Sequence, residues 1–299
     1  MKAKLGFLGL GVMGSSIAVN LMKGGFRLNL WNRSRKDHVE LQHENGTFTK
    51  SPAEAVRDVD IILYSLSNDE AIENVIFGPE GVLSGIHEGQ LAINLGTVHP
   101  EMSKREAAAY NHSGVAYLDA PVFGSKNEAE AADLCIVIGG NYSDYLRALP
   151  VFAAMSSSTH YMGETGKGAA MGLVGSLMVC MQLEALGEGL ILAQKAGLMT
   201  EKVVEILGIP DFRSPLFRDM GSQIISRNFE PVFTLDHLYK DSNQIIRLAD
   251  ELGVAVPGVA GVREVIKGAV INGWGHENAS AMVKALELQS NITVKKKKS

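Results

Sequence analysis

The strongest constraint on the fold is a glycine-rich segment close to the N-terminus. It ends the apolar run 5–10 and opens an amphipathic stretch. The first glycine permits a tight turn, the second lets the backbone approach a pyrophosphate, and the third allows close helix–strand packing. Backbone N–H groups at the start of the helix would face the phosphates. The segment therefore predicts a dinucleotide-binding turn whose cofactor-binding residues are Gly9, Leu10, Gly11, Val12, Met13 and Gly14.

Short apolar runs alternate with amphipathic stretches through the first half of the chain. Runs typical of buried strands cover residues 5–10, 27–31, 60–66, 90–95, 115–120 and 134–138. Helical patterns cover residues 11–23, 52–57, 69–77, 100–110 and 143–152. This alternation indicates an α/β fold with a mostly parallel sheet covered on both faces. Residues 1–163 are thus predicted to form a Rossmann-type, doubly wound domain that binds NADP.

The second half has a different character, because it is helical throughout. Residues 166–197 are rich in Met, Leu, Ala and Gly, and about 30 helical residues span roughly 45 Å, more than one small domain requires. We expect a long interdomain helix over about 166–196 that is buried all round. Further helices are predicted at 201–207, 235–252, 259–271 and 279–289, so residues 164–299 form an all-α domain.

The end of the second predicted strand bears on the choice of cofactor. A protein that binds NAD usually has Asp or Glu here, which holds the ribose 2′-hydroxyl. This chain has no acid at that point, and a guanidinium with a hydroxyl suits a 2′-phosphate. The sequence therefore favours NADPH, with an ordinary surface arginine as the alternative interpretation. The cofactor-binding residues predicted here are Asn32, Arg33 and Ser34.

Composition excludes several other classes of protein. The formal charge of −5 over 299 residues gives no basic surface for nucleic acid. Cys135 and Cys180 lie far apart without a CxxC or Cys/His cluster, which favours a reduced cytoplasmic protein without a metal site. No uncharged apolar stretch reaches the ~18 residues of a membrane span, so no membrane partner is expected. The basic run Lys295 to Lys298 is interpreted as a solvated, disordered tail.

Several segments in the same order resemble the β-hydroxyacid dehydrogenases, especially the glyoxylate/succinic semialdehyde reductase branch. These segments are residues 6–14, 31–34, Asp119-Ala120-Pro121-Val122, Gly124-Ser125-Lys126 and 233–241. The resemblance covers nearly the whole chain. It implies a Rossmann domain followed by an all-helical domain, an active site in the cleft between them, and a homodimer or homotetramer.

The resemblance also implies roles for individual residues. Leu66 and Thr97 match positions that line the cofactor, and Lys240 matches a lysine in contact with it. Phe233 and Asp241 match the substrate pocket. The residues assigned to the substrate pocket are Phe123, Gly124, Gly172, Ser176, Phe233 and Asp236.

Four positions depart from the family pattern. Gly172 stands where the family has its catalytic lysine, and Ser176 where an asparagine follows one helical turn later. Gly96 and Phe123 each replace a serine. Together these changes remove an ammonium and several polar groups and add one large aromatic ring. The resulting pocket is drier and poorly suited to a small anionic hydroxy acid.

We therefore expect an NADPH-dependent reductase of a bulky, largely apolar C=N or C=O compound. A protonated imine already carries its proton, whereas a neutral carbonyl gains roughly 10²–10⁴-fold from a general acid. The imine reductases, a group related by the same resemblance, also lack the lysine. Asp241 is the first candidate for a proton donor and Tyr239 the second. Alternatively, Asp241 only pairs with Lys240 or caps nearby backbone.

Two other functions remain open from the sequence. The chain could be a catalytically inactive scaffold or sensor that keeps the cofactor site, because it lacks the family lysine. It could also reduce a small semialdehyde or β-hydroxyacid precursor, with Asp241 or water as the acid. The first alternative predicts NADPH binding without turnover, and the second predicts slow reduction of glyoxylate or succinic semialdehyde.

Overall fold

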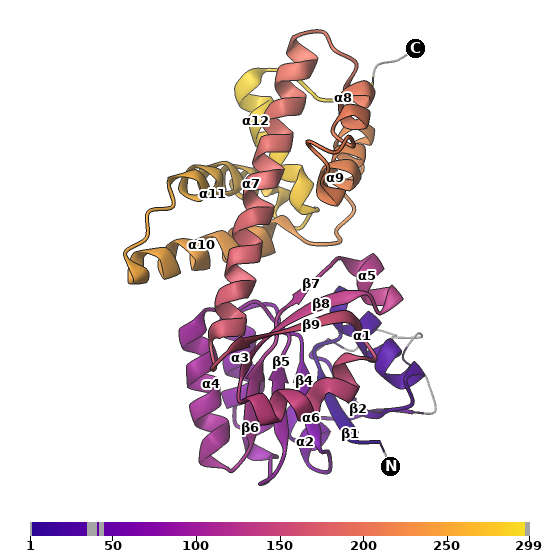
Figure 1. The fold of residues 1–299 in the computed structure, drawn as a ribbon, viewed down its shortest axis with the longest axis vertical. Helices are drawn as coiled ribbons and strands as arrows, with labels where there is room; N and C mark the ends of the chain where they lie inside the picture. Colours follow the sequence, from indigo (N-terminus) through magenta and orange to yellow (C-terminus); the bar gives the residue numbers. More distant parts are fainter. Residues whose placement is uncertain (1, 35–40, 42–44, 297–299) are drawn as a thin grey trace. The chain divides into compact units, whose positions relative to one another are not determined.

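The computed structural model describes residues 2–34, 41 and 45–296, which form two compact units, Met1–Leu173 and Val174–Ser299. Figure 1 shows a sheet-containing unit and a helical unit that share one long helix, α7 (Lys167–Lys195). The division falls inside α7, so the first turns of this helix belong to unit 1. The predicted α/β fold followed by an all-α part is confirmed.

Unit 1 is built on one sheet with the strand order β3-β2-β1-β4-β5-β6-β8-β7. A further strand, β9, also pairs with β8. All pairings are parallel except those of β6 and β7 with β8. The order reverses between β1 and β4, where doubly wound sheets bind their ligands. The strands are β1 (Lys4–Leu8), β2 (Arg27–Trp31), β3 (Gly46–Phe48), β4 (Ile61–Tyr64), β5 (Leu91–Asn94), β6 (Ala116–Asp119), β7 (Val122–Phe123), β8 (Leu134–Gly140) and β9 (Ser156–Gly163).

Two hydrophobic cores cover the two faces of this sheet. Alternate residues of one strand enter different cores, as Leu63 and Tyr64 of β4 do. This arrangement explains why the central strands are almost uniformly apolar in sequence. The helical segments of unit 1 before α7 are α1 (Val12–Lys23), α2 (Pro52–Val56), α3 (Asp69–Ile72) with its π-helical continuation η2 (Glu73–Phe77), η3 (Val82–Ser84), α4 (Pro100–His112), α5 (Lys126–Ala131) and α6 (Tyr142–Phe152).

The helical unit packs around a smaller core that includes Leu190, Ile224 and Val283. Its elements after α7 are α8 (Thr200–Ile206), α9 (Pro215–Ser226), α10 (Leu235–Leu252), α11 (Pro257–Ala269) with its π-helical continuation η4 (Val270–Trp274), η5 (Ala279–Met282) and α12 (Val283–Ser290). The predicted helices are present, and α9 is an addition.

A C-terminal strap, residues 291–296, ties the helices of this unit together. Arg227 donates to Glu287 at 2.6 and 3.1 Å, and Glu287 also accepts the backbone N–H of Val294 at 2.7 Å. The backbone N–H of Lys296 donates to the Ile225 carbonyl. The first residues of the predicted basic tail are therefore held in place, while Lys297 and Lys298 lie outside the described residues.

The expectation that the long helix is buried all round is wrong for the single chain. Val174, Met178 and Leu192 are 51%, 53% and 72% exposed, so one apolar face of α7 has no cover from the described chain. By length and composition α7 could cross a membrane. A single helix of this kind is a weak sign, because core helices of soluble proteins share these properties. The absence of a membrane partner stays a prediction.

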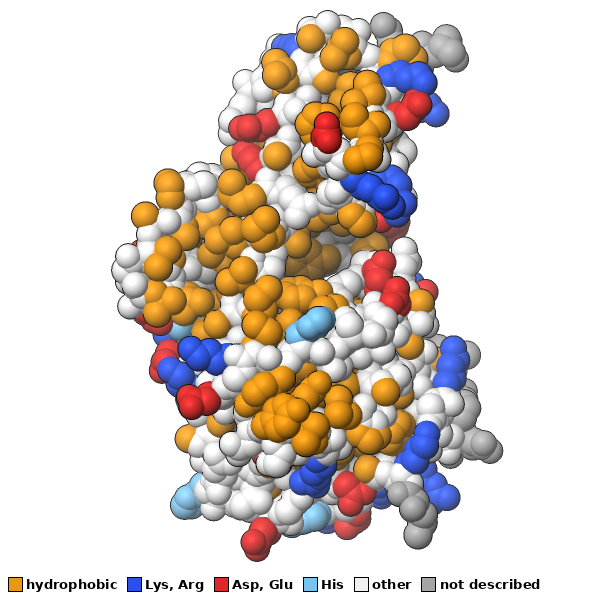
Figure 2. Space-filling view, viewed as in Figure 1, with side chains coloured by type: hydrophobic (Ala, Val, Ile, Leu, Met, Phe, Trp, Pro, Cys, Tyr) orange, Lys and Arg blue, Asp and Glu red, His pale blue; other side chains and the backbone are white. Residues whose placement is uncertain are grey.

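An exposed aromatic patch lies on unit 1. Tyr142 and Tyr145 of α6 contact Tyr161 of the edge strand β9, with ring centroids 5.1 and 5.6 Å apart. Figure 2 shows this hydrophobic patch over α6, and the neighbouring Leu146 is also exposed. The patch contains none of the residues assigned to the site.

Candidate functional site

The glycine-rich turn has the geometry that each of its glycines predicts. Gly9 has φ +88°, and a Cβ there would collide with the Ser65 carbonyl oxygen of the neighbouring strand end. A Cβ on Gly14 would overlap the Gly9 carbonyl and lie 3.3 Å from the Phe7 ring. Around Gly11, in contrast, no atom lies within 4 Å of a Cβ position. Two glycines thus permit close packing, and the middle one faces open space.

The start of α1 offers an anion site next to this open space. Gly11 is the N-cap of α1, no side chain caps the helix, and its first turn carries no acidic residue. Backbone N–H groups at such a terminus favour a phosphate. The residues present therefore fit the pyrophosphate of a dinucleotide, with Leu10, Val12 and Met13 supplying the surrounding backbone.

The segment after β2 is built around Asn32. Its Oδ1 accepts the backbone N–H of Leu10 at 3.0 Å, and its Nδ2 donates to the Ser34 carbonyl oxygen at 2.9 Å. Asn32 therefore links the glycine-rich turn to the end of β2. Arg33 is exposed and makes no hydrogen bond or ion pair with the described part of the chain.

The ends of β4 and β5 bring further predicted residues to the same edge of the sheet. A Cβ on Gly9 would lie 3.2 Å from Leu66 Cδ2, and a Cβ on Gly96 would lie 3.1 Å from the Leu66 carbonyl oxygen. The backbone N–H of Gly96 donates to Asn94 Oδ1 at 2.8 Å. Asn94 thus holds the turn that leads to Thr97.

A buried carboxylate supports this turn from inside the unit. Asn94 Nδ2 donates to Glu106 Oε2 at 2.9 Å, and the hydroxyls of Tyr64 and Tyr117 donate to Glu106 at 2.7 and 3.0 Å. Burial raises the pKa of Glu106 to about 7, against the lowering effect of these three hydrogen bonds. No pattern in the sequence indicates this network, because Glu106 lies in an ordinary helical stretch.

Asp119 anchors the first turn of α7. Its Oδ1 accepts the N–H of Gly166 at 2.8 Å, and its Oδ2 accepts the N–H of Ala169 at 2.6 Å. A Cβ on Gly139 or Gly168 would lie within 3 Å of this carboxylate, so glycine is required at both positions. Burial raises the pKa of Asp119 to about 6, although these backbone hydrogen bonds act in the opposite direction. In the sequence, Asp119 stands out only as part of the motif Asp119-Ala120-Pro121-Val122.

Gly172 lies on the same helix, close to the segments after β5 and β6 that carry Thr97 and Pro121. A Cβ there would lie 3.0 Å from Pro121 Cγ and 3.9 Å from Thr97 Cγ2. A side chain at this position would therefore begin between Pro121 and Thr97. In this chain the position presents only backbone, and the nearest surface is the apolar proline ring.

One turn further along α7, Ser176 belongs to a polar cluster in unit 2. Its hydroxyl donates to Asp241 Oδ2 at 2.9 Å. Lys240 Nζ lies 3.0 Å from Asp241 Oδ1, an oxygen with no aligned hydrogen-bond donor in the described chain. The Asp241 side chain is 4% exposed and that of Lys240 is 22% exposed. Burial, followed by the Asp241 charge, raises the pKa of Cys180 on the next turn of α7 to about 12.

This cluster bears on the predicted proton donor. Asp241 Oδ2 accepts a hydrogen bond from Ser176, and Oδ1 forms an ion pair with Lys240. The ion pair of Asp241 with Lys240, which the alternative interpretation expects, is present in the structure. A donor role for Asp241 or Tyr239 stays a prediction; Tyr239 is half-buried on α10.

The remaining predicted pocket residues are divided between the two units. Phe123 lies half-buried in β7, and Gly124 has φ +137° with no room for a Cβ against Leu134. In unit 2, Phe233 contacts His237 with ring centroids 6.1 Å apart. Asp236 is exposed and packs against the backbone of Gly275, so it does not join the Asp241 cluster.

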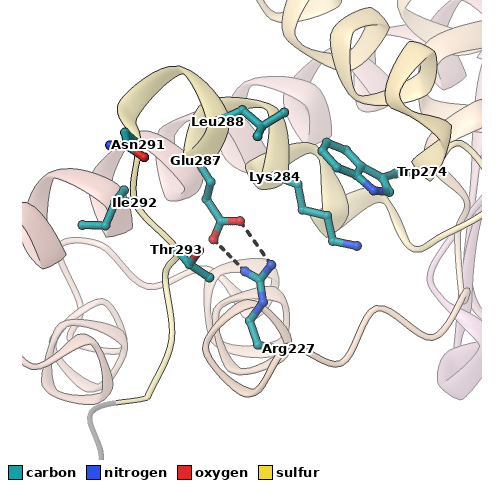
Figure 3. A pocket seen from close by; sticks show the side chains of 8 residues that line it. All are labelled: Arg227, Trp274, Lys284, Glu287, Leu288, Asn291, Ile292 and Thr293. Atoms are coloured by element: carbon teal, nitrogen blue, oxygen red, sulfur yellow. Dashed lines mark hydrogen bonds and ion pairs between the residues drawn. The ribbon is translucent and has the colours of Figure 1, made fainter.

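A separate cavity of about 400 Å³ lies in unit 2, away from the predicted residues. Figure 3 shows Arg227 and Glu287 paired within it, beside Lys284 and Trp274. Lys284 pairs with Glu277. Because these charged groups already pair with one another, we interpret the cavity as part of the packing of the C-terminal strap and not as a ligand site. Within the described residues, no three His, Cys, Asp or Glu side chains are arranged to hold a metal.

A parallel sheet with this strand order, a glycine turn at its reversal point and an uncapped helix start defines a dinucleotide-binding protein. The family model described as the NAD binding domain of 6-phosphogluconate dehydrogenase matches residues 4–163. The model described as NAD-binding of NADP-dependent 3-hydroxyisobutyrate dehydrogenase matches residues 166–286. The chain belongs to the β-hydroxyacid dehydrogenase superfamily and is an NAD(P)-dependent oxidoreductase.

Relatives and solved structures agree with this assignment. Glyoxylate/succinic semialdehyde reductase 1 of Arabidopsis thaliana is 33% identical over 284 residues, which cover 95% of this chain and 98% of the relative. The structure of 3-hydroxyisobutyrate dehydrogenase from Salmonella typhimurium matches with a TM-score of 0.85 and 22% identity, covering 95% of this chain and 99% of that one. An imine reductase from Myxococcus stipitatus in complex with NADP+ matches with a TM-score of 0.61 and 18% identity, covering 95% and 99%. The last two show likeness of fold alone.

Proposed function

We propose that this protein is an NADPH-dependent reductase of a bulky, largely apolar C=N or C=O compound. The observation that carries the proposal is Gly172, which presents bare backbone beside Pro121 and Thr97. No ammonium can reach a substrate from this position. An apolar wall at the same place favours a large neutral or delocalised substrate over a small carboxylate.

NADPH, when bound, supplies the hydride. The chain's own residues would bind and orient it through the N-terminus of α1, the turn Gly9–Gly14 and the strand ends that carry Leu66 and Thr97. The absence of an acid after β2 and the exposed Arg33 support NADPH over NADH, because a 2′-phosphate is repelled by a carboxylate and attracted by a guanidinium. Asn32 would hold the glycine-rich turn next to the segment that follows β2.

A small semialdehyde or hydroxyacid is the second candidate substrate class. It is favoured by the 33% identity to a glyoxylate/succinic semialdehyde reductase over nearly the whole chain. Against it stands the bare backbone at position 172, which supplies neither an acid nor a group to hold a carboxylate.

The test is NADPH oxidation followed at the nicotinamide absorbance, with cyclic imines, apolar ketones, glyoxylate and succinic semialdehyde as acceptors. We expect turnover of the imines or bulky ketones and almost none of the small acids. Faster turnover of the small acids would make the second candidate correct. NADPH binding without turnover of any acceptor would contradict both and leave a scaffold or sensor.

A matched pair of variants tests the same position directly. Gly172→Lys adds an ammonium and Gly172→Met adds comparable bulk without charge. The new Cβ requires the Pro121 ring to move by a few tenths of an ångström. We expect Gly172→Lys alone to raise succinic semialdehyde reduction, whereas equal effects of both variants would show that charge at this position is irrelevant.

A further inference from the structure

Glu106 places an ionisable group beneath the edge of the sheet that also carries the glycine-rich turn. Its side chain is fully buried, and three neutral groups donate to it: the hydroxyls of Tyr64 and Tyr117 and the amide of Asn94. A buried acid costs free energy that a neutral side chain of the same size would avoid. Ionisable groups with perturbed pKa values gather at functional sites. The network therefore indicates a role beyond packing.

A continuous series of contacts joins Glu106 to the glycine-rich turn within unit 1. Asn94 donates to Glu106 through Nδ2 at 2.9 Å and accepts the N–H of Gly96 through Oδ1 at 2.8 Å. The turn at Gly96 lies against Leu66, because a Cβ on Gly96 would be 3.1 Å from the Leu66 carbonyl oxygen. Leu66 Cδ2 would in turn be 3.2 Å from a Cβ on Gly9. Glu106 therefore supports, through Asn94, the strand ends next to the dinucleotide-binding turn.

We propose that Glu106 is a positioning residue for the dinucleotide cofactor, and that its ionised form holds the turn at Gly96 in the conformation that binds the cofactor. The inference rests on the cofactor part of the proposed function and is independent of the substrate. An ionised carboxylate only accepts hydrogen bonds, which matches the three donors around it. It thus keeps the Asn94 amide turned with Oδ1 toward the Gly96 N–H.

Protonation of Glu106 requires one hydrogen bond of the network to reverse, because the new O–H needs an acceptor. A reversed tyrosine would direct its own O–H into the apolar core to which the Tyr64 and Tyr117 rings belong. A reversed Asn94 amide gives up the N–H of Gly96, and this glycine is only half-buried. The less costly rearrangement therefore releases the turn at Gly96 and weakens cofactor binding.

Glu106 is the group in this network whose titration falls near neutral pH. Burial raises its pKa to about 7 and that of Asp119 to about 6, so Asp119 titrates first as pH rises. Burial also raises the pKa values of the three neighbouring tyrosines far above their usual range, so they stay neutral. β5 contributes the neutral amide of Asn94. The charged and titratable groups that face Glu106 are Tyr64 on β4, Tyr117 and Asp119 on β6, and Tyr110 and Arg105 on α4.

The experiment measures NADPH affinity by nicotinamide fluorescence between about pH 6 and about pH 8.5 in the wild type and in Glu106→Gln. Glutamine imitates the protonated acid, because it offers one acceptor oxygen and one donor and does not titrate. We expect wild-type affinity to rise roughly two- to tenfold across this range, the change expected for one hydrogen bond. Glu106→Gln should keep the weaker affinity throughout. The ratio of the two affinities cancels the titration of the cofactor's own 2′-phosphate.

Two further variants separate positioning from a loss of packing. Tyr117→Phe removes one hydrogen bond that favours the ionised acid, so it should move the midpoint of the affinity profile to higher pH. Asn94→Ala removes the link to Gly96, so adding Glu106→Gln to this variant should cause no further loss of affinity. Glu101→Gln, on the exposed face of α4, is the matched control and should keep the wild-type profile.

Several results would overturn the assignment. If the ratio of wild-type to Glu106→Gln affinity is the same at every pH, ionisation of Glu106 does not reach the cofactor site. If Glu106→Gln weakens binding equally with and without Asn94, the effect does not pass through the turn at Gly96. A wild-type protein that binds neither NADPH nor NADH would contradict the proposed function together with this inference. The first two results contradict the inference alone, so the two failures are distinct.

Discussion

At the scale of a single residue, the proposed preference for NADPH over NADH depends on Arg33. It follows β2 directly, is exposed, and makes no ion pair with the residues that the structure describes. A charge-assisted contact with a 2′-phosphate contributes about 1.5–3 kcal/mol, so Arg33→Ala should weaken NADPH binding by roughly 10- to 100-fold. NADH has no 2′-phosphate and should bind about equally to both proteins. Nicotinamide fluorescence titration measures both affinities.

Arg57→Ala supplies the control for this prediction. Arg57 is also exposed and stands at the C-cap of α2. Its removal changes the net charge by the same amount, so it should leave NADPH and NADH affinity unchanged. Equal weakening of both cofactors in Arg33→Ala would show that Arg33 contacts a part that they share, and the preference for NADPH would then need another cause.

Residues with a local steric need could be read from the sequence, whereas residues with distant partners could not. Gly9 and Gly14 stand where backbone approaches leave no room for a Cβ, and the spacing of the glycines alone predicts this. Asp119 and Glu106 accept hydrogen bonds from residues up to 50 positions away. No spacing along the chain signals such partners.

Elements were predictable in proportion to their length and periodicity. The predicted helix over 235–252 has the bounds of α10, and the central strands differ from prediction by one or two residues. The short strands β3 and β7 were missed, and β9 was missed because its first half is the run 156–159 of Ser and Thr, without apolar alternation. Two overlooked signals were present: the capping box of Ser125 and Glu128 before α5, and Pro215 at the start of α9.

Two buried carboxyl groups, those of Glu106 and Asp119, should make the free energy of unfolding depend on pH. Burial raises the pKa of Glu106 to about 7 and that of Asp119 to about 6, whereas both lie near ~4 in an unfolded chain. At pH values between the unfolded and the folded pKa of each group, the folded protein keeps a proton that the unfolded chain has released. The free energy of unfolding therefore falls as pH rises from about 4 to about 7.

Glu106→Gln should flatten this dependence by about half, because a neutral amide does not titrate and Asp119 still does. The measurement is urea unfolding between pH 4.5 and 7.5. Glu101→Gln, on the exposed face of the same helix, is the matched control and should keep the wild-type slope. An unchanged slope in Glu106→Gln would mean that Glu106 is ionised in the folded protein throughout this range.

At the scale of the whole molecule, each unit has its own core and its own tryptophan. Trp31 ends β2 in unit 1 and Trp274 ends η4 in unit 2, and they are the two tryptophans of the chain. Trp274→Phe leaves a fluorescence reporter for the sheet unit, and Trp31→Phe leaves one for the helical unit. The stability of the two units can therefore be followed separately in the intact protein.

The C-terminal strap should determine the stability of the helical unit alone. Glu287 is 7% exposed, and its partners are Arg227 and the backbone of Val294. Arg227→Met leaves a buried carboxylate without its cation, which should lower the free energy of unfolding reported by Trp274 by about 3–5 kcal/mol. The transition reported by Trp31 should stay in place, because both cores of the sheet unit lie before residue 174. The double variant Arg227→Met/Glu287→Leu removes both charges and should recover most of the loss. If both reporters shift together by the same amount, the two units unfold as one cooperative body through the continuous helix α7, and the separation of cores does not extend to stability.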